Sequence, residues 1–326
     1  MAAKIKIFKR KLLHNNFVFV DGIAKSGKIV VSSIISSLKN TENQSMQGTF
    51  NNYVKFKTLK LLDEDLTVDL ILQAMQKFMI ESQLSRFLNF RKYDLSSVYN
   101  SLKKKDYLNR LKIKDNPREI EKIIKNLKKN KNILPIVVDD FFPNCTGKLR
   151  YFYNFKKIII FRNPIGICYD NLTRDRAKKK IIGHPWQDVF HYKKNNQKIP
   201  WFVEPKNIDK FLYSSKIEKH LMFVNSEIKP YLNKKIFQVP NTQYFFLEDI
   251  WKNPNHCVKL LSKFLKTKET KYTQLMLKKL DLPRSSIKDN YEKQFFFLKS
   301  KMSTSEFSFV LKLEKIYKSN KSLHGF

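Results

Sequence analysis

The chain has 326 residues, of which 42% are hydrophobic, so it is long enough to bury a substantial core. Its 64 Lys and Arg residues against 29 Asp and Glu residues give a net charge of +35, which would attract nucleic acid, an anionic membrane surface or small anionic substrates. The three cysteines are widely separated and show no metal-ligand spacing, which argues against a disulfide framework or a zinc site and favours a reducing cytoplasm.

The amino-terminal stretch is basic, but its apolar run is interrupted by His14 and Asn15 and ends at Asp21. Such a run is too short and too broken for a signal peptide or a membrane span. We therefore expect a cytoplasmic protein without a membrane span. Abundant Lys, Asn, Ile and Phe with only 7 Gly are also typical of an AT-rich genome, so the charge alone does not identify a partner.

The segment 17–38 combines a short apolar run, a Gly-containing loop and a helical pattern. Gly22 to Lys28 fits G-x-x-x-x-G-K, the phosphate-binding loop, but Ile29 stands where Ser or Thr normally ligates Mg²⁺. Backbone N–H groups, the helix dipole, Lys25 and Lys28 can still bind a phosphate there, whereas a magnesium-dependent kinase is disfavoured. The alternative is an ordinary strand–helix turn with exposed lysines.

Two helices and a strand are predicted next. The stretch 63–90 carries an apolar face behind acidic residues suited to a helix start, formed by Leu66, Leu70, Ile71, Met75, Phe78 and Met79. Asn116 can cap a second helix that begins at Pro117. The apolar run 133–138 then predicts a strand that stops at two carboxylates, Asp139 and Asp140.

A second strand–loop–helix unit follows, with a buried strand over 158–161 and a helix from Pro164. Further on we predict a helix over 216–232, strands over 235–239 and 243–247, a helix from Pro254 and a helical tail after Ser286. This alternation predicts an α/β fold of three layers, with a parallel central sheet flanked by helices. We expect one domain over 1–326, with a core at about 17–265 and a helical carboxyl-terminal extension over 266–326.

"AKSGK" after a strand resembles the 5′-phosphosulfate loop, P-K-S-G-T-T, of sulfotransferases that use 3′-phosphoadenosine-5′-phosphosulfate (PAPS). That family has a phosphate-loop fold and needs no metal. The resemblance places Lys25 on the lysine that contacts the phosphosulfate and Ser26 and Gly27 on the backbone cradle. Lys28 and Ile29 then fall on the two threonines.

"KIIIFRNPIGICYDN" is similar to the second strand and 3′-phosphate site of the same family. There an Arg directly after the strand and a Ser eight residues further on hold the 3′-phosphate. Arg162 occupies the first position and Asp170 the second, so either Asp170 opposes the phosphate or Tyr169 or Thr173 supplies the hydroxyl. The alternative is a solvent-facing Arg beside a helix-capping Asn-Pro turn.

The segment 243–266 resembles a third family segment, Y-E-D-L, N-P and K-F-L-G. Leu247 replaces the Tyr and Lys266 the Gly, while the matching residues are Glu248, Asp249, Asn253, Pro254, Phe264 and Leu265. The resemblance extends unevenly from about 17 to 265. The late Gly-rich 3′-phosphate loop of the family has no counterpart, and 266–326 is unassigned.

Sulfuryl transfer needs a base, for which the family uses His or Glu. Asp139 and Asp140 lie where many members carry K-T-H, and His184 is a poorer candidate. Side chains alternate along an extended chain, so only one of the two Asp residues should face the cleft. The pair can instead be a strand-end turn or a metal-binding acidic pair as in kinases.

Aromatic residues can line an acceptor pocket or belong to the core: Phe141, Phe142, Trp186 and Trp201.

The resemblance implies a metal-independent sulfotransferase that moves a sulfuryl group from PAPS to a small-molecule or glycan hydroxyl or amine, leaving 3′-phosphoadenosine-5′-phosphate (PAP). Lys25 with Asp139 or Asp140 would act in catalysis. The donor site would comprise Gly22, Lys25, Ser26, Gly27, Lys28, Ile29, Arg162 and Asp170. Nucleic acid is not the expected partner, although the charge would permit it. The alternatives are a phosphate-loop kinase and a catalytically silent nucleotide-binding or polyanion-binding protein.

Overall fold

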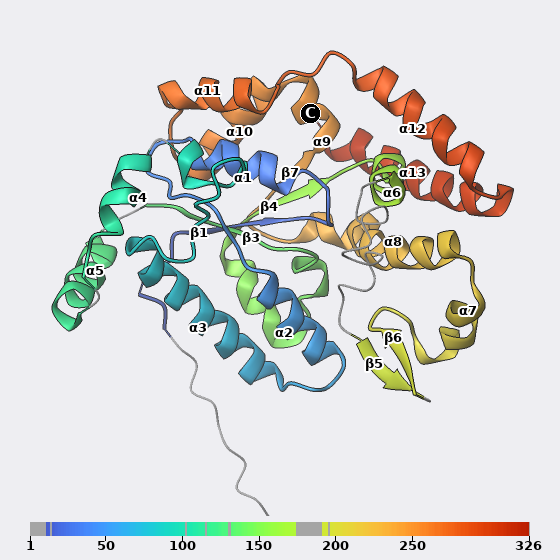
Figure 1. Cartoon of the computed structure of the whole chain (residues 1–326), viewed down its shortest axis with the longest axis horizontal. Helices are drawn as coiled ribbons and strands as arrows, with labels where there is room; N and C mark the ends of the chain where they lie inside the picture. The colour runs from blue at the N-terminus through green and yellow to red at the C-terminus, as the bar shows by residue number, and fades with distance from the viewer. Residues whose placement is uncertain are drawn as a thin grey trace, which may run out of the picture.

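The computed structural model describes residues 11–13, 15–101, 103–114, 116–129, 132–173, 191–194 and 196–325 (Figure 1). Its centre is a sheet of five strands that all pair in parallel. In spatial order the strands are β2 (Ser45–Met46), β3 (Leu134–Val137), β1 (Phe17–Asp21), β4 (Lys156–Phe161) and β7 (Thr242–Phe246). The predicted α/β fold class is therefore confirmed.

Helices make up most of the remaining described chain. They are α1 (Lys28–Ser36), α2 (Gly48–Thr58), α3 (Glu64–Gln83), α4 (Lys104–Arg110), α5 (Pro117–Lys129), α6 (Pro164–Thr173), α7 (Ile208–Tyr213), α8 (Lys216–Leu232), α9 (Leu247–Lys252), α10 (Pro254–Leu265), α11 (Lys271–Lys279), α12 (Ile287–Lys301) and α13 (Thr304–His324). Two longer 3₁₀ helices are η3 (Gly147–Asn154) and η6 (Lys234–Gln238). A small antiparallel hairpin pairs β5 (His191–Lys194) with β6 (Gln197–Pro200).

The two faces of the sheet bury different apolar clusters, because successive strand residues point to opposite faces. In β1, Val18 and Val20 join a cluster with residues of α1, α10 and α11, whereas Phe17 and Phe19 join one with residues of α2, α3, α8 and η3. All four side chains are buried. Helices therefore cover both faces, which gives the three-layer arrangement (Figure 1).

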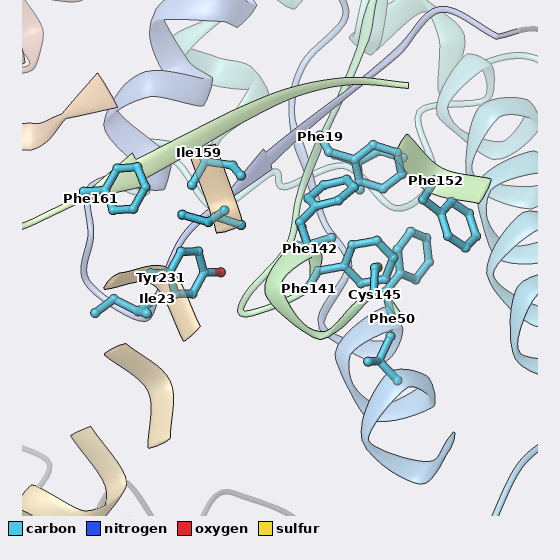
Figure 2. Close-up of a cluster of buried hydrophobic side chains, with 14 of the residues drawn as sticks. Phe19, Ile23, Phe50, Phe141, Phe142, Cys145, Phe152, Ile159, Phe161 and Tyr231 are labelled. Atoms are coloured by element: carbon cyan, nitrogen blue, oxygen red, sulfur yellow. The ribbon is translucent and has the colours of Figure 1, made fainter. Parts of the chain in front are cut away.

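Phenylalanine rings fill the core beneath the carboxyl end of β1 (Figure 2). The Phe19 ring stacks on Phe141 with centroids 5.8 Å apart and meets Phe142 edge-on at 5.3 Å. Phe141 also contacts Phe152 of η3 at 5.6 Å. Phe141 and Phe142 are fully buried, so of the two roles considered from the sequence they have the core one. This packing fixes the chain directly after Asp139 and Asp140.

The cap expected at Asn116 is present, and the acidic start expected of the first helix includes a cap at Asp63. The Asp63 carboxylate accepts from Asp65 N at 2.8 Å and starts α3, and Asn116 Oδ1 accepts from Glu119 N at 3.0 Å at the start of α5. Four of the six apolar residues predicted to face the core from α3 are buried, whereas Leu66 and Leu70 are partly exposed.

The predicted strand over 235–239 is wrong, because these residues belong to η6. Asn233 starts the turn: its side chain accepts from Lys235 N at 3.0 Å, and its carbonyl accepts from Ile236 N at 3.0 Å. Local side-chain bonding of this kind competes with sheet pairing. The apolar residue Ile236 is still buried, which explains why the sequence pattern looked like that of a strand.

The carboxyl-terminal extension packs onto the rest of the chain. Helix α11 lies against α1, and α12 and α13 lie against α6. Val310, Leu313 and Tyr317 of α13 belong to the cluster that contains Phe19, and Asn320 Nδ2 donates to the Leu232 carbonyl at 3.1 Å. Residues 266–325 therefore complete the core, and the helical tail predicted after Ser286 is confirmed.

A buried carboxylate just before β2 anchors α4. Glu42 accepts from Arg110 Nη1 at 3.0 Å, from the Tyr107 hydroxyl at 2.9 Å and from Asn132 Nδ2 at 2.8 Å. Burial alone would raise the pKa of Glu42, but Arg110 and Lys103 outweigh it and lower the pKa to about 2. The ionised carboxylate is thus strongly favoured in the folded protein.

We expect Glu42→Gln to lower the free energy of unfolding near pH 7 by about 3 kcal/mol, because the pKa difference corresponds to that amount. The stabilisation is present above the unfolded pKa of 4.5 and is lost as the pH falls toward 2. Urea unfolding of both proteins should therefore show a gap about 2 kcal/mol smaller near pH 3 than near pH 7. Glu119→Gln, at a partly exposed residue, is the control, and an equal loss in both variants would contradict the assignment.

Candidate functional site

The loop after β1 lies at the carboxyl edge of the sheet, between two strands that also end in polar residues. β1 pairs with β3 on one side and β4 on the other. Asp139 and Asp140 follow β3, and Arg162 follows β4. The chain crosses over β1 between β3 and β4, and such a crossover at the carboxyl ends of parallel strands is where α/β proteins usually bind ligands.

The loop after β1 has a compact backbone. Lys25 and Gly27 have positive φ angles of 67° and 96°, and Ser26 N donates to the Ile23 carbonyl at 3.2 Å. The φ angle of Gly27 favours glycine, and a Cβ atom there would also displace the Leu247 side chain, whose Cδ1 would lie 2.4 Å away. The buried Ser26 hydroxyl has no hydrogen-bond partner among the residues that the structure describes.

Lys28, the first residue of α1, folds its side chain back into the loop. Its ammonium group donates to the carbonyls of Gly22 at 2.6 Å and Ile23 at 2.7 Å, and it forms an ion pair with Asp139. The Lys28 side chain is only 6% exposed. These contacts use all three donors of the ammonium group, so an anion that binds Lys28 must replace at least one of them.

Lys25, Arg162 and Asp170, predicted as parts of one donor site, meet on the other side of the loop. Arg162 Nη1 donates to the Lys25 carbonyl at 2.9 Å and to Asp170 Oδ2 at 2.6 Å. Lys25 Nζ donates to the Asp170 carbonyl at 2.9 Å and to Asn171 Oδ1 at 2.6 Å. The loop is thereby joined to α6, although Lys25 and Arg162 are 137 residues apart in the sequence.

The solvent-facing alternative for Arg162 is wrong, because its side chain is only 7% exposed. Gly166, one turn along α6, makes room for it: a Cβ atom there would lie 3.0 Å from Arg162 Nε. The hydroxyl of Thr173 donates to the Tyr169 carbonyl at 2.7 Å, and the Tyr169 ring packs edge-on against Phe297 at 5.2 Å.

A second arginine lies near Arg162. Both guanidinium groups lie near the Trp251 ring. That of Arg162 is 5.7 Å from the ring centroid, and that of Arg284 is 4.7 Å from it. The backbone N–H of Arg284 donates to the Trp251 carbonyl at 2.9 Å, while its buried Nε atom has no partner within the described ranges. Burial lowers the pKa of Arg284, and the charge of Arg162 adds to this effect. Two cations thus share one aromatic ring.

Asp21, at the end of β1, joins the loop to the turn after β3. Its carboxylate accepts from Gly22 N at 2.8 Å, Phe142 N at 2.8 Å, Phe141 N at 3.2 Å and the Tyr231 hydroxyl at 2.9 Å. Figure 2 shows the Tyr231 ring between Ile23 and the aromatic cluster. Burial raises the pKa of Asp21 to about 6 against the opposing effect of these hydrogen bonds.

The two candidate bases have different environments. Asp139 is 36% exposed and paired with Lys28, whereas Asp140 is buried in a left-handed conformation with φ 51°. Burial and the nearby Glu227 raise the pKa of Asp140, and burial likewise raises the pKa of Glu227. Glu227 also interacts electrostatically with Asp139 and Lys55. The alternation expected of an extended chain therefore does not apply, because Asp140 turns out of the strand and both carboxyl groups interact with Glu227.

The third motif, which contains Glu248 and Asp249, holds the turn of the second motif, which contains Arg162, in place. The Glu248 carboxylate accepts from Asn163 N at 3.0 Å and from the Tyr317 hydroxyl. Asn163 Nδ2 donates in turn to Glu314 at 2.9 Å, so α13 is connected to the residue directly after Arg162. Asp249 forms an ion pair with Lys321 at 2.6 Å. These contacts give Glu248 and Asp249 a structural role in holding the Arg162 turn.

The remaining residues predicted from the sequence lie in different places. Ile29 packs at the edge of the apolar cluster beneath α1. The Trp201 ring lies 4.4 Å below the Lys55 ammonium group. His184 and Trp186 lie outside the described residues. Within those residues no group of three His, Cys, Asp or Glu side chains could hold a metal ion, and no helix is long and apolar enough to cross a membrane.

Five residues of the site were not found from the sequence: Asp21, Lys55, Asn171, Glu227 and Arg284. Asp21 is the last residue of a buried strand and directly precedes the loop, a position that could have indicated a role. Asn171 follows Asp170 within the motif that was already considered. Lys55, Glu227 and Arg284 lie in segments whose sequence carries no distinguishing pattern.

A scan against models of known protein families finds no match to this chain, and a comparison with curated proteins finds none either.

Proposed function

We propose that the protein binds PAPS across the loop after β1 and transfers its sulfuryl group to a hydroxyl or amine acceptor. The observation that carries the proposal is the direct contact between Lys25 and Arg162, the two residues that the resemblance assigns to opposite ends of the donor.

The donor set fits a ligand with two anionic ends. Lys25 and Lys28 would hold the 5′ end with the loop N–H groups, and Arg162 would hold the 3′-phosphate, with Arg284 as a second cation beside Trp251. Asp139 and Asp170 each neutralise one of these cations in the ligand-free protein. Ligand binding therefore requires Lys28 and Arg162 to exchange carboxylate partners for phosphate.

When bound, PAPS would supply an activated sulfuryl group whose bond to the 5′-phosphate breaks as the bond to the acceptor forms. The acceptor proton must pass to a carboxylate near the loop. Asp139 is the accessible candidate, while Asp140 and Glu227 have raised pKa values that make each a stronger base. Lys25 and Lys28 would stabilise negative charge on the departing phosphate.

The test is Lys25→Ala, which we expect to weaken PAP binding by roughly a hundredfold, since it removes a charged hydrogen bond of about 2–3 kcal/mol. Lys60→Ala is the matched control, because Lys60 also has a positive φ angle, 60°, and is exposed. Titration calorimetry measures both affinities, and circular dichroism verifies the fold. If Lys25→Ala binds PAP as tightly as the control, the loop does not hold the donor.

A phosphate-loop kinase is the second candidate, favoured by the ion pair between Lys28 and Asp139 at the end of the neighbouring strand. Thermal shifts with PAP, with ATP and Mg²⁺, and with heparin separate this candidate and a polyanion-binding protein from the sulfotransferase proposal, because a ligand that binds only the folded state raises the melting temperature. We expect the largest shift with PAP and no loss of activity in EDTA. An absolute metal requirement would favour the kinase.

A further inference from the structure

A basic hollow lies at the amino edge of the sheet, the edge opposite the candidate site. It encloses about 440 Å³ and borders the start of β1, the residue before β3 and the chain that follows α1 and α10. The lining residues are Asn16, Phe17, Val18, Lys39, Asn40, Ile133, Lys156, Leu265, Lys266, Thr267 and Lys268. This volume lies within the range of small-molecule sites, about 300–1,000 Å³.

Four lysines give the hollow a strong positive charge, and its lining contains no acidic residue. None of these four side chains, Lys39, Lys156, Lys266 and Lys268, forms an ion pair with any residue that the structure describes. By contrast, the buried cations Lys28 and Arg162 of the candidate site do have carboxylate partners. Within the described residues, therefore, no carboxylate neutralises these four lysines.

The effect of this crowding is evident at Lys156. Burial lowers the pKa of Lys156, and the charge of Lys266 lowers it further. The Lys156 ammonium donates to the Phe264 carbonyl at 2.8 Å, at the carboxyl end of α10. This bond occupies one of its three donors and leaves two for a ligand.

Backbone hydrogen bonds hold the walls in place. Lys39 N donates to the Lys268 carbonyl at 2.8 Å, and the Thr267 hydroxyl donates to the Lys39 carbonyl. Ile133 N donates to the Asn40 carbonyl at 2.8 Å, which connects the same loop to β3. The lysines thus extend from a fixed framework, and a binder with fixed geometry loses less entropy when it takes up its ligand.

We propose that this hollow binds an organic anion that carries at least two phosphate or sulfate groups. Several lysines around one cavity suit several charges rather than one, and each ammonium group binds a phosphate or sulfate oxygen as a compact cation. Phe17, Val18, Ile133 and Leu265 provide an apolar wall for the organic part of the ligand. The inference does not depend on the function proposed for the loop.

The test is titration calorimetry with ADP and with a heparin tetrasaccharide, in a Lys25→Ala background that weakens binding at the loop. Lys39→Met with Lys268→Met removes two exposed charges, and Lys156→Met with Lys266→Met removes the partly buried Lys156 together with its exposed neighbour Lys266. Lys259→Met with Lys299→Met is the matched control, since both residues are exposed and neither lines the hollow.

We expect either pair in the hollow to weaken binding at least tenfold, while the control pair changes it less than twofold. If Lys156→Met with Lys266→Met unfolds the protein because Lys156 no longer caps α10, Lys39→Met with Lys268→Met still tests whether the hollow binds the ligand. Loss confined to ADP identifies a free nucleotide-like ligand, and loss confined to the tetrasaccharide identifies the end of a sulfated polymer. Equal weakening by the hollow and control pairs, or none by either, would overturn the proposal.

Discussion

Replacing Asp21 by Asn is expected to lower the free energy of unfolding by about 3–5 kcal/mol, since it leaves buried N–H donors without an acceptor. The carboxylate receives three backbone N–H groups and one hydroxyl, and both of its oxygens are used. An amide keeps only one acceptor oxygen and directs its own N–H₂ at these donors. Urea unfolding with intrinsic fluorescence measures the loss.

Tyr231→Phe is the matched control for this change. It removes one of the four donors without placing a new donor there, so we expect a loss of only about 1 kcal/mol. Because the Gly22 and Phe142 N–H groups remain paired in this variant, the loop should still bind its ligand. A loss as large as that of Asp21→Asn would show that the hydroxyl, rather than the backbone donors, is the main partner.

The pH dependence distinguishes Asp21 from an ordinary packing residue. Its folded pKa of about 6 lies above the ordinary value of 3.8, so folding takes up a proton between these values. The stability linked to this proton is fully present below about pH 4 and is lost as the pH rises through 6. Asp21→Asn lacks this dependence. The gap between the two proteins should therefore be about 2 kcal/mol larger near pH 4.5 than near pH 7.

The sequence predicted the elements whose pattern is local. The strands β1, β3, β4 and β7 and the loop after β1 were recognisable because apolar runs ended directly before Asp21, Asp139, Arg162 and Glu248. The same reasoning failed over 235–239, where Ile236 is buried from a 3₁₀ helix. Burial alone therefore does not identify a strand, and the capping residue Asn233 carried the missing information.

Much of the candidate site depends on long-range placement instead. The sequence motifs named Lys25, Arg162 and Asp170 separately, but a motif does not show that Asp170 pairs with Arg162. Glu227 lies on α8 and Arg284 in the carboxyl-terminal extension, and both reach the site only through packing of helices onto the sheet. Single-sequence patterns contain no term for such contacts, which explains why these residues were missed.

Asp170→Ser is expected to tighten PAP binding by roughly tenfold or more, a gain of about 1.4 kcal/mol or more. In the structure Asp170 forms an ion pair with Arg162. A carboxylate a few ångströms from a phosphate dianion opposes binding of that phosphate by about 1–4 kcal/mol at an intermediate dielectric. Serine removes this repulsion and frees the guanidinium for the phosphate. Titration calorimetry with PAP gives the affinity.

The same substitution should destabilise the ligand-free protein, because it leaves Arg162 buried without its partner, at a cost of about 3 kcal/mol or more. Saturating PAP should then recover most of the lost melting temperature, since the 3′-phosphate takes the place of the carboxylate. A variant that is merely unstable would not bind PAP more tightly. This opposite movement of stability and affinity is the signature of a carboxylate that occupies an anion site.

Adenosine 5′-phosphosulfate, which lacks the 3′-phosphate, is the control ligand. Its affinity should hardly change in Asp170→Ser, whereas Arg162→Ala should abolish the preference for PAP over this ligand. A gain of equal size for both ligands would indicate a general effect on the loop, to which Arg162 is bonded through the Lys25 carbonyl. If neither substitution separates the two ligands, Arg162 and Asp170 form a structural ion pair, and the 3′-phosphate site must be sought at Arg284.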